Sequence, residues 1–132
     1  CYLPTAFSRP QLLEHLLNSL KSQFDLWKWE VYVQIEPSDK LGEILHLINN
    51  IDLGVRVHYR VNHKVLGIRD NPYQCIEWAL QDGALHFLLL EEDLELSADA
   101  LQFCEHAFNT SYFSKKYFCG NLHFSTCDNM SH

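Results

Sequence analysis

The sequence predicts an α/β fold in which a mostly parallel, Rossmann-like sheet carries helices on both faces. Two observations support this prediction. Short apolar segments of strand type alternate with longer segments of helical periodicity along the chain of 132 residues. Such alternation is typical of parallel strands joined by crossover helices. One strand segment ends in four consecutive apolar residues, Phe87 to Leu90, which is the pattern of a strand buried on both faces.

Five strands are predicted, at residues 2–7, 30–35, 55–59, 86–90 and 117–119. The first is a weak strand, because Pro4 cannot donate a hydrogen bond to its neighbour. The second alternates β-branched residues and ends at Glu36, before a Pro-Ser turn. Residues 60–69 have no clear period, so we expect a loop there.

Four helices are predicted between and after these strands. The first begins with Ser8 as its cap and Pro10 in its first turn. The second covers residues 41–50. The third begins at residues 70–72, with a polar cap and a proline, and ends near Gly83. The fourth is capped by Ser97, and Leu96 before it can pack on Leu101.

Apolar residues at helical spacing predict which face of each helix is buried. For the first helix they are Leu12, Leu13, Leu16, Leu17, Leu20 and Phe24. For the second and third they are Ile44, Leu45, Ile48, Tyr73, Ile76, Ala79 and Leu80. For the fourth they are Leu101, Cys104 and Phe108. We also expect the three tryptophans, Trp27, Trp29 and Trp78, to be core and hinge-packing aromatics rather than sugar-binding platforms.

Size and charge exclude several classes of protein. A chain of 132 residues suffices for a single domain, residues 1–132, with a real core. The net charge of −7 and the lack of a basic stripe argue against a nucleic-acid partner. No apolar run reaches the roughly 20 residues that span a bilayer.

The five cysteines form no CxxC pair and no zinc spacing. Cys75 and Cys104 lie on predicted core faces and are expected to be buried thiols. Cys119 and Cys127 flank a short loop and could form a disulfide. The compartment stays open.

Three adjacent carboxylates, Glu91, Glu92 and Asp93, follow the apolar run. Carboxylates so close repel one another, so we expect a positive charge to offset them. A hard divalent cation, Mg²⁺ or Mn²⁺, suits oxygen ligands, although a solvated acidic turn explains the same residues. Because strands one, two and four should end at the same edge of the sheet, Arg9, Glu36 and the three carboxylates should converge on one crevice.

This set of residues resembles the nucleotide-sugar-binding half of glycosyltransferases with the glycosyltransferase A fold. It is most similar to the Golgi N-acetylglucosaminyltransferase that starts complex N-glycans and to its protein O-mannose relatives. Their fourth strand ends in Glu-Asp-Asp-Leu-Glu with an Asp and a helix shortly after, and residues 91–99 read EEDLELSAD. The resemblance implies that Mn²⁺ or Mg²⁺ and the donor diphosphate bind here. Asp93 would then be the metal ligand, with Glu91 beside it and Glu92 near the ribose and donor sugar. Glu92 departs from the family, which has Asp there.

Three further positions match this family. An Arg after its first strand and an acid after its second hold the uracil base, and Arg9 and Glu36 occupy those places. The stretch from Gly67 to Pro72 resembles the loop over the diphosphate, where Arg69 could pair with phosphate. Each of these side chains also has an ordinary explanation as a surface charge or a turn carboxylate.

The resemblance implies a glycosyltransferase that moves a sugar from a UDP-linked donor to a hydroxyl of a glycan, protein or small-molecule acceptor. Asp128 and Glu95 are the candidates for the general base. The acceptor-binding half of the family is apparently absent, so we expect a short relative, a fragment or a donor-binding module. Two alternatives stay open, namely a non-catalytic sugar-nucleotide-binding or regulatory domain and a metal-dependent hydrolase or nucleotidyltransferase.

Overall fold

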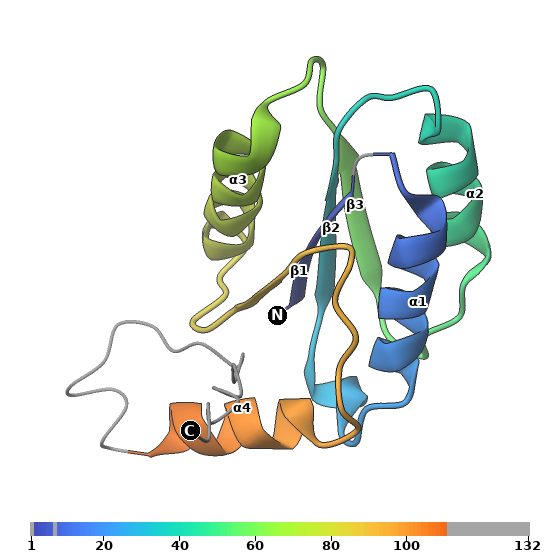
Figure 1. The fold of residues 1–132 in the computed structure, drawn as a ribbon. Coiled ribbons are helices and arrows are strands. Elements are labelled where there is room, and N and C mark those ends of the chain that lie inside the picture. The colour runs from blue at the N-terminus through green and yellow to red at the C-terminus, as the bar shows by residue number, and fades with distance from the viewer. Residues whose placement is uncertain (1, 7, 111–132) are drawn as a thin grey trace, which may run out of the picture.

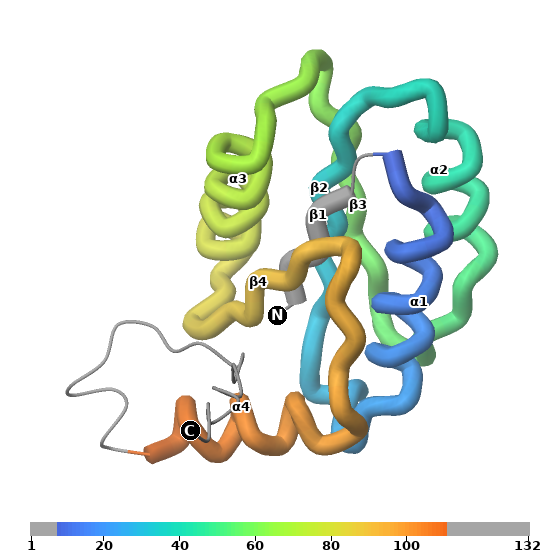
Figure 2. Tube along the Cα trace, in the orientation of Figure 1, coloured from blue at the N-terminus to red at the C-terminus, as the bar shows by residue number. Residues whose placement is uncertain are grey.

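The computed structural model describes residues 2–6 and 8–110. Four parallel strands form one sheet in the order β3-β2-β1-β4. As Figures 1 and 2 show, α1 and α2 cover one face of this sheet, α3 covers the other, and α4 lies beyond the end at which the strands begin. The predicted parallel α/β architecture with helices on both faces is therefore confirmed.

The strands are β1 (Tyr2–Ala6), β2 (Val31–Ile35), β3 (Val57–Val61) and β4 (Leu88–Leu90). The helices are α1 (Pro10–Lys21), α2 (Leu41–Asn50), α3 (Gly67–Gln81) and α4 (Ala100–Asn109), with a short 3₁₀ turn at Leu26–Lys28. Residues 41–50 were predicted as a helix with the same bounds. The predicted strand at 117–119 and the possible disulfide between Cys119 and Cys127 lie outside the described residues.

Strand β2 is buried on both faces, and its side chains point alternately into two separate cores. Val31, Val33 and Ile35 face the larger core, which also contains Leu13, Leu16, Leu17 and Leu20 of α1 and Ile44 and Ile48 of α2. Tyr32 faces the smaller core under α3, with Cys75, Trp78 and Ala79. The predicted burial of both cysteine thiols is confirmed, since Cys75 and Cys104 are buried and free.

Strand β4 differs from the prediction of burial on both faces. It is an edge strand in the sheet of described residues, only three residues long, and Leu89 is 38% exposed. Conversely, β1 was predicted to be weak, yet it lies between β2 and β4. Pro4 removes only one hydrogen-bond donor, whereas parallel pairing with β2 and β4 holds β1 along both of its edges.

The predicted start of α3 is wrong. We expected a loop at residues 60–69, but β3 continues to Val61 and the helix begins at Gly67, so Pro72 lies inside it. The predicted inward face is also wrong in part, because Tyr73 and Leu80 are 64% and 48% exposed. The buried residues of this helix are Asn71, Cys75, Trp78 and Ala79.

The two predicted serine caps are also wrong. The residues that precede α1 and α4 are Arg9 and Asp99, and neither helix has a side-chain cap of its own. Two aromatic predictions fail as well, because Phe24 is 56% and Trp27 73% exposed. Both follow the end of α1, where the chain turns toward β2 and the helical face no longer contacts the sheet.

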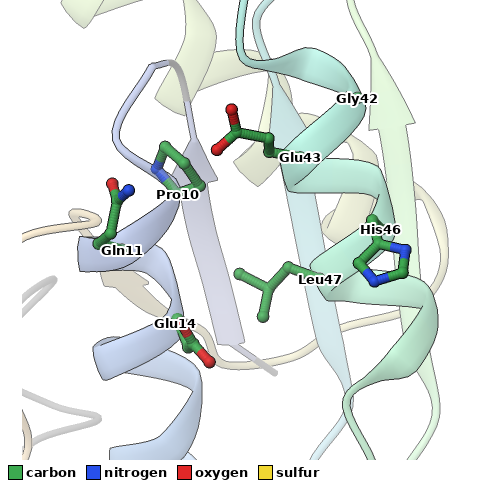
Figure 3. Close-up of a pocket in the computed structure, with 7 residues that line it drawn as sticks. All are labelled: Pro10, Gln11, Glu14, Gly42, Glu43, His46 and Leu47. Carbon is green, nitrogen blue, oxygen red and sulfur yellow. The ribbon is translucent and has the colours of Figure 1, made fainter.

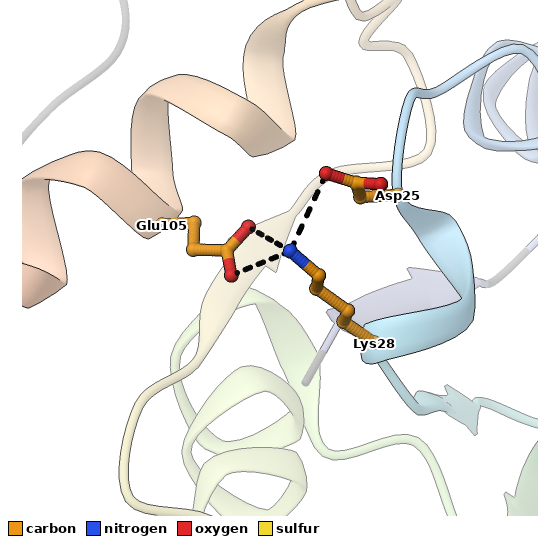
Figure 4. Close-up of polar contacts among 3 residues, drawn as sticks. All are labelled: Asp25, Lys28 and Glu105. Atoms are coloured by element: carbon orange, nitrogen blue, oxygen red, sulfur yellow. Dashed lines mark hydrogen bonds and ion pairs between the residues drawn. The ribbon is translucent and has the colours of Figure 1, made fainter.

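Helix α4 is tied to the turn before β2 by charged groups at the surface. The Nζ of Lys28 lies 3.1 Å from Oε1 of Glu105 and 3.4 Å from Oδ2 of Asp25 (Figure 4). These contacts raise the pKa of Lys28 above its ordinary value, chiefly through the hydrogen bond to Glu105. No helix among the described residues is long and apolar enough to cross a membrane.

Candidate functional site

The strand order defines one special position at the edge where the parallel strands end. From β1 the chain passes outward to β2 and β3, and it then returns to the other side of β1 to form β4. In open α/β sheets, ligands bind at such a switch in direction, beyond the carboxyl ends of the two strands. Pro4 of β1 pairs with Leu90 of β4, so Arg9 and the acidic residues 91–93 follow the two strands that flank the switch.

Arg9 and the acidic turn are in direct contact. The Nε of Arg9 donates to Oε1 of Glu92 at 2.7 Å, and an η nitrogen lies 3.8 Å from Oδ2 of Asp93. The hydrogen bond and the charge of Glu92 raise the pKa of Arg9 above its ordinary value. The positive charge that the sequence requires near these carboxylates is therefore supplied by Arg9.

The three carboxylates do not point the same way. Residues 91–94 form a turn in which the Leu94 N–H donates to the Glu91 carbonyl at 3.2 Å. The side chain of Glu92 is only 8% exposed, whereas that of Asp93 is 45% exposed. Glu91 is exposed as well. Glu92 thus anchors the turn, and Asp93 faces solvent.

The turn offers few side chains that could hold a metal ion. Among the residues that the structure describes, no three His, Cys, Asp or Glu side chains are grouped to hold a metal ion. Magnesium in nucleotide sites usually takes one or two protein carboxylates, and phosphate and water supply the rest. Asp93 is the carboxylate that could serve in this way.

Glu36 lies at the same edge, because Ile35 pairs with Ala6 at the end of β1. Glu36 is 4% exposed. Its Oε1 accepts hydrogen bonds from the backbone N–H groups of Leu66 and Gly67, each at 2.7 Å. These two N–H groups begin α3. The carboxylate is thus already bound to the protein backbone at the start of a helix.

The remaining predicted site residues are Arg69, Glu95 and Asp128. The side chain of Arg69 is 93% exposed and pairs with Asp70, its neighbour, at 3.0 Å. Glu95 is exposed just beyond the acidic turn. Asp128 lies outside the described residues.

Sequence reasoning missed a chain of amides beside Glu36. Gln34 Nε2 donates to Oδ1 of Asn62, and Nδ2 of Asn62 donates to Oδ1 of Asn71 at 2.8 Å. The Asn62 N–H donates to the Ile35 carbonyl at 2.8 Å. The polar residue inside the apolar strand, Gln34, was the available signal, because a buried amide needs a partner.

A groove of about 470 Å³ lies apart from these residues, between α1 and α2. Figure 3 shows that it is lined by Pro10, Gln11 and Glu14 from α1 and by Gly42, Glu43, His46 and Leu47 from α2. These side chains come from the two helices rather than from strand ends, and none was predicted as a site residue. Glu43 also pairs with Lys40 at 3.2 Å.

The fold and this edge together define a Rossmann-like α/β domain with a switch in strand order between β1 and β4. Two solved structures of TarS from S. aureus are similar to it in fold. One matches with a TM-score of 0.58 and 17% identity over 81% of this chain and 19% of that chain. The second, of TarS residues 1–349, matches with a TM-score of 0.59 and 19% identity over 81% of this chain and 32% of that chain.

These matches confirm the predicted fold type. The chain spans about a fifth and about a third of the two structures it matches. No protein-family model matches the sequence, and the comparison with curated proteins gives no match. The narrower resemblance to the Golgi N-acetylglucosaminyltransferases is not shown by these comparisons and remains a hypothesis.

Proposed function

We propose that this chain binds the donor of a glycosyltransferase, a UDP-linked sugar such as UDP-N-acetylglucosamine, together with Mn²⁺ or Mg²⁺. The observation that carries the proposal is the contact of Arg9 with Glu92 and Asp93 at the switch between β1 and β4. A charged turn at this place in a parallel sheet suits a ligand that carries both negative charge and a metal.

Each residue of the turn has a separate role in this proposal. Asp93 would hold the metal, which supplies positive charge to the diphosphate leaving group. Glu92 holds the turn through its hydrogen bond with Arg9, and the guanidinium keeps further N–H donors for an anionic oxygen. Glu95 and Asp128 are the proposed candidates for the base that deprotonates the acceptor hydroxyl.

Thermal unfolding with and without ligand tests this function. Millimolar Mn²⁺ with UDP should stabilise the protein by about 2.7 kcal/mol at a hundredfold excess over the dissociation constant. The same experiment with GDP, CMP and ADP identifies the nucleobase that the site prefers. An unfolding curve that Mn²⁺ and UDP leave unmoved argues strongly against a donor site.

Asp93→Asn locates the metal. A neutral amide is a poor ligand for a hard cation, so this variant should lose the metal-dependent part of UDP binding. Glu14→Gln, in the groove between α1 and α2, is the matched control and should bind as the unmodified protein does. If Glu14→Gln lost metal-dependent UDP binding and Asp93→Asn kept it, the site would lie in that groove instead.

Transfer activity separates the enzyme from the alternative, a non-catalytic sugar-nucleotide-binding module. The enzyme should release UDP from UDP-N-acetylglucosamine in the presence of Mn²⁺ and a hydroxyl acceptor. Metal-dependent UDP binding with no turnover, measured on the full-length protein, would favour the module.

A further inference from the structure

We propose that Glu36 acts in nucleotide binding as a positioning residue, which fixes the start of α3, and not as a direct reader of the base. This inference rests on the proposed nucleotide site. It concerns a carboxylate at the ligand edge whose oxygen is already bound to two backbone N–H groups.

The backbone around Leu66 and Gly67 has the form of an anion-binding nest. Leu66 has φ −96° and ψ −26°, in the right-handed region, and Gly67 has φ +88°, in the left-handed region. Successive residues of these two conformations turn their N–H groups toward a common point. Oε1 of Glu36 occupies that point, at 2.7 Å from both nitrogens.

The contact is strong enough to hold the helix start in place. Both hydrogen bonds involve an ionised acceptor and are short, which is typical of the stronger charge-assisted class. A carboxylate at the beginning of a helix is also stabilised by the helix dipole. Glu36 is 4% exposed, so water competes little for its oxygens.

The connection before the helix is held at its other end as well. Asn62 donates its N–H to the Ile35 carbonyl, accepts from Gln34 and donates to Asn71. The connection at residues 62–67 is thus attached to the last residues of β2 and to Glu36, both where it begins and where it ends. It lies beside the end of β1. Loss of Glu36 would release this connection and the first turn of α3, which includes Arg69.

The two possible roles of Glu36 predict different selectivity for the base. Uracil carries an N–H at ring position 3, whereas cytosine has a bare nitrogen there. If Glu36 accepted that N–H, its loss would weaken UDP binding alone. If it positions α3, its loss weakens UDP and CDP binding by the same factor, since both need the same loop.

Gly67→Ala tests the role while leaving the Glu36 carboxylate intact. A β-carbon at Gly67 meets no atom within 4 Å, so the substitution acts through the left-handed backbone alone. Strain of that kind should weaken binding of UDP and CDP by about tenfold each. Gly54→Ala is the matched control, because Gly54 has φ +71° and equally open surroundings but lies before β3, at the opposite end of the sheet.

The experiment measures Mn²⁺-dependent UDP and CDP affinity by calorimetry for Glu36→Ala, Glu36→Gln, Gly67→Ala and Gly54→Ala. We expect the first and third to lower both affinities equally, Gly54→Ala to change neither, and Glu36→Gln to keep part of the affinity through its amide oxygen. A Glu36→Ala variant that loses only the preference for UDP, with Gly67→Ala unaffected, would overturn the proposal.

Amide hydrogen exchange tests the contact itself without any nucleotide. The Leu66 and Gly67 amides should be protected in the unmodified protein and should exchange at least tenfold faster in Glu36→Ala, since the acceptor is gone. Unchanged protection would overturn the positioning role. If the unmodified protein binds no nucleotide, the proposed function fails, while the exchange rates still decide whether Glu36 holds this helix.

Discussion

The Arg9–Glu92 pair joins two residues that are 83 positions apart in the chain, and it brings charge compensation to a carboxylate with little access to water. Glu92 has an 8% exposed side chain, whereas that of Arg9 is 52% exposed. A half-exposed guanidinium contributes less than a buried one, because water and salt screen it. The pair therefore contributes to stability mainly through the charge compensation that Arg9 gives to Glu92.

Arg9→Ala should lower the free energy of unfolding by about 1–2 kcal/mol, below the range for a fully buried pair. Urea denaturation measures this loss. The double variant Arg9→Ala with Glu92→Gln is the control and should regain much of the stability, because it removes the carboxylate charge that Arg9 offsets. Equal stability of the single variant and the unmodified protein would show that other contacts of Glu92 are sufficient to offset its charge.

A buried amide that follows α1 helps to hold the segment between the acidic turn and α4. Gln23 is 7% exposed, donates to the Ser97 carbonyl at 2.7 Å and accepts the Leu101 N–H at 3.2 Å. The second bond satisfies an N–H in the first turn of α4, the place that a side-chain cap normally fills. A residue 78 positions away thus replaces the serine cap that local sequence predicted.

Gln23→Ala should therefore lower the free energy of unfolding by about 1–3 kcal/mol, because it leaves the Ser97 carbonyl and the buried Leu101 N–H without this partner. Ser22→Ala is the matched control. Its hydroxyl bonds at 3.3 Å to Asn18 in an exposed position, so the loss there should stay within about 0.5 kcal/mol. Similar losses for the two variants would contradict the role assigned to Gln23.

Helix α3 packs on aromatic rings of the sheet through the ring of Trp78. Tyr32 stacks on His58 with ring centroids 4.5 Å apart and meets the edge of Trp78 at 4.9 Å. The guanidinium of Arg60 lies over Trp78 at 4.1 Å. Burial, followed by the hydrogen bond to Glu30, raises the pKa of Tyr32 to about 12, and burial also raises the pKa of the Cys75 thiol to about 12.

These shifts predict a loss of stability at alkaline pH. Below about pH 9 both groups are protonated in the folded and unfolded states, so their contribution is fully present. As the pH rises, the unfolded chain loses the Cys75 proton near 9 and the Tyr32 proton near 10, whereas the folded protein keeps both until about 12. The free energy of unfolding should thus fall between pH 9 and 12.

Urea denaturation across that range measures the slope, and Tyr32→Phe should reduce it above pH 10 because phenylalanine has no proton to lose. A Tyr32→Phe slope equal to that of the unmodified protein would assign the loss to other groups. Tyr73→Phe, on the exposed side of α3, is the control and should leave the slope unchanged.

The order of the elements could be predicted from the sequence because apolar periodicity and chain punctuation agree over most of it. Residues 41–50 are the clearest case, since the apolar spacing of Ile44 and Ile48 and the break at Gly54 define the same helix. Where contacts distant in sequence decide, local reasoning failed. The Asp-Asn-Pro sequence at 70–72 looks like a helix start, but Glu36, 30 residues earlier, accepts the N–H groups that begin α3 at Gly67.

The candidate site, like the fold, could be predicted only in part. The position of the acidic turn follows from a strand that ends in carboxylates, and the sheet brings Arg9 to it as expected. The division of roles does not follow from spacing, since only the fold determines that Glu92 is buried and Asp93 is not. Nor could the sequence show that Glu36 is already bound to backbone, because Leu66 and Gly67 gave no signal as partners.

The net charge of −7 makes the whole molecule repel an anionic nucleotide and attract a divalent cation. Added salt screens both effects beyond the Debye length, which falls from about 30 Å at 0.01 M to about 8 Å at 0.15 M. We therefore expect Mn²⁺ binding to weaken as salt rises, and metal-free UDP binding to strengthen slightly. Calorimetry at the two ionic strengths measures both, with unchanged protein and buffer.

The opposite result for UDP would be informative about the local charges. Arg9 and Arg69 are two guanidinium groups near the carboxyl edge that already pair with carboxylates. If metal-free UDP binding weakened several-fold with salt, these guanidinium groups would outweigh the field of the whole protein. Arg9→Ala would then abolish that salt dependence, whereas Lys28→Ala, at the Glu105 contact beyond the other end of the sheet, would preserve it.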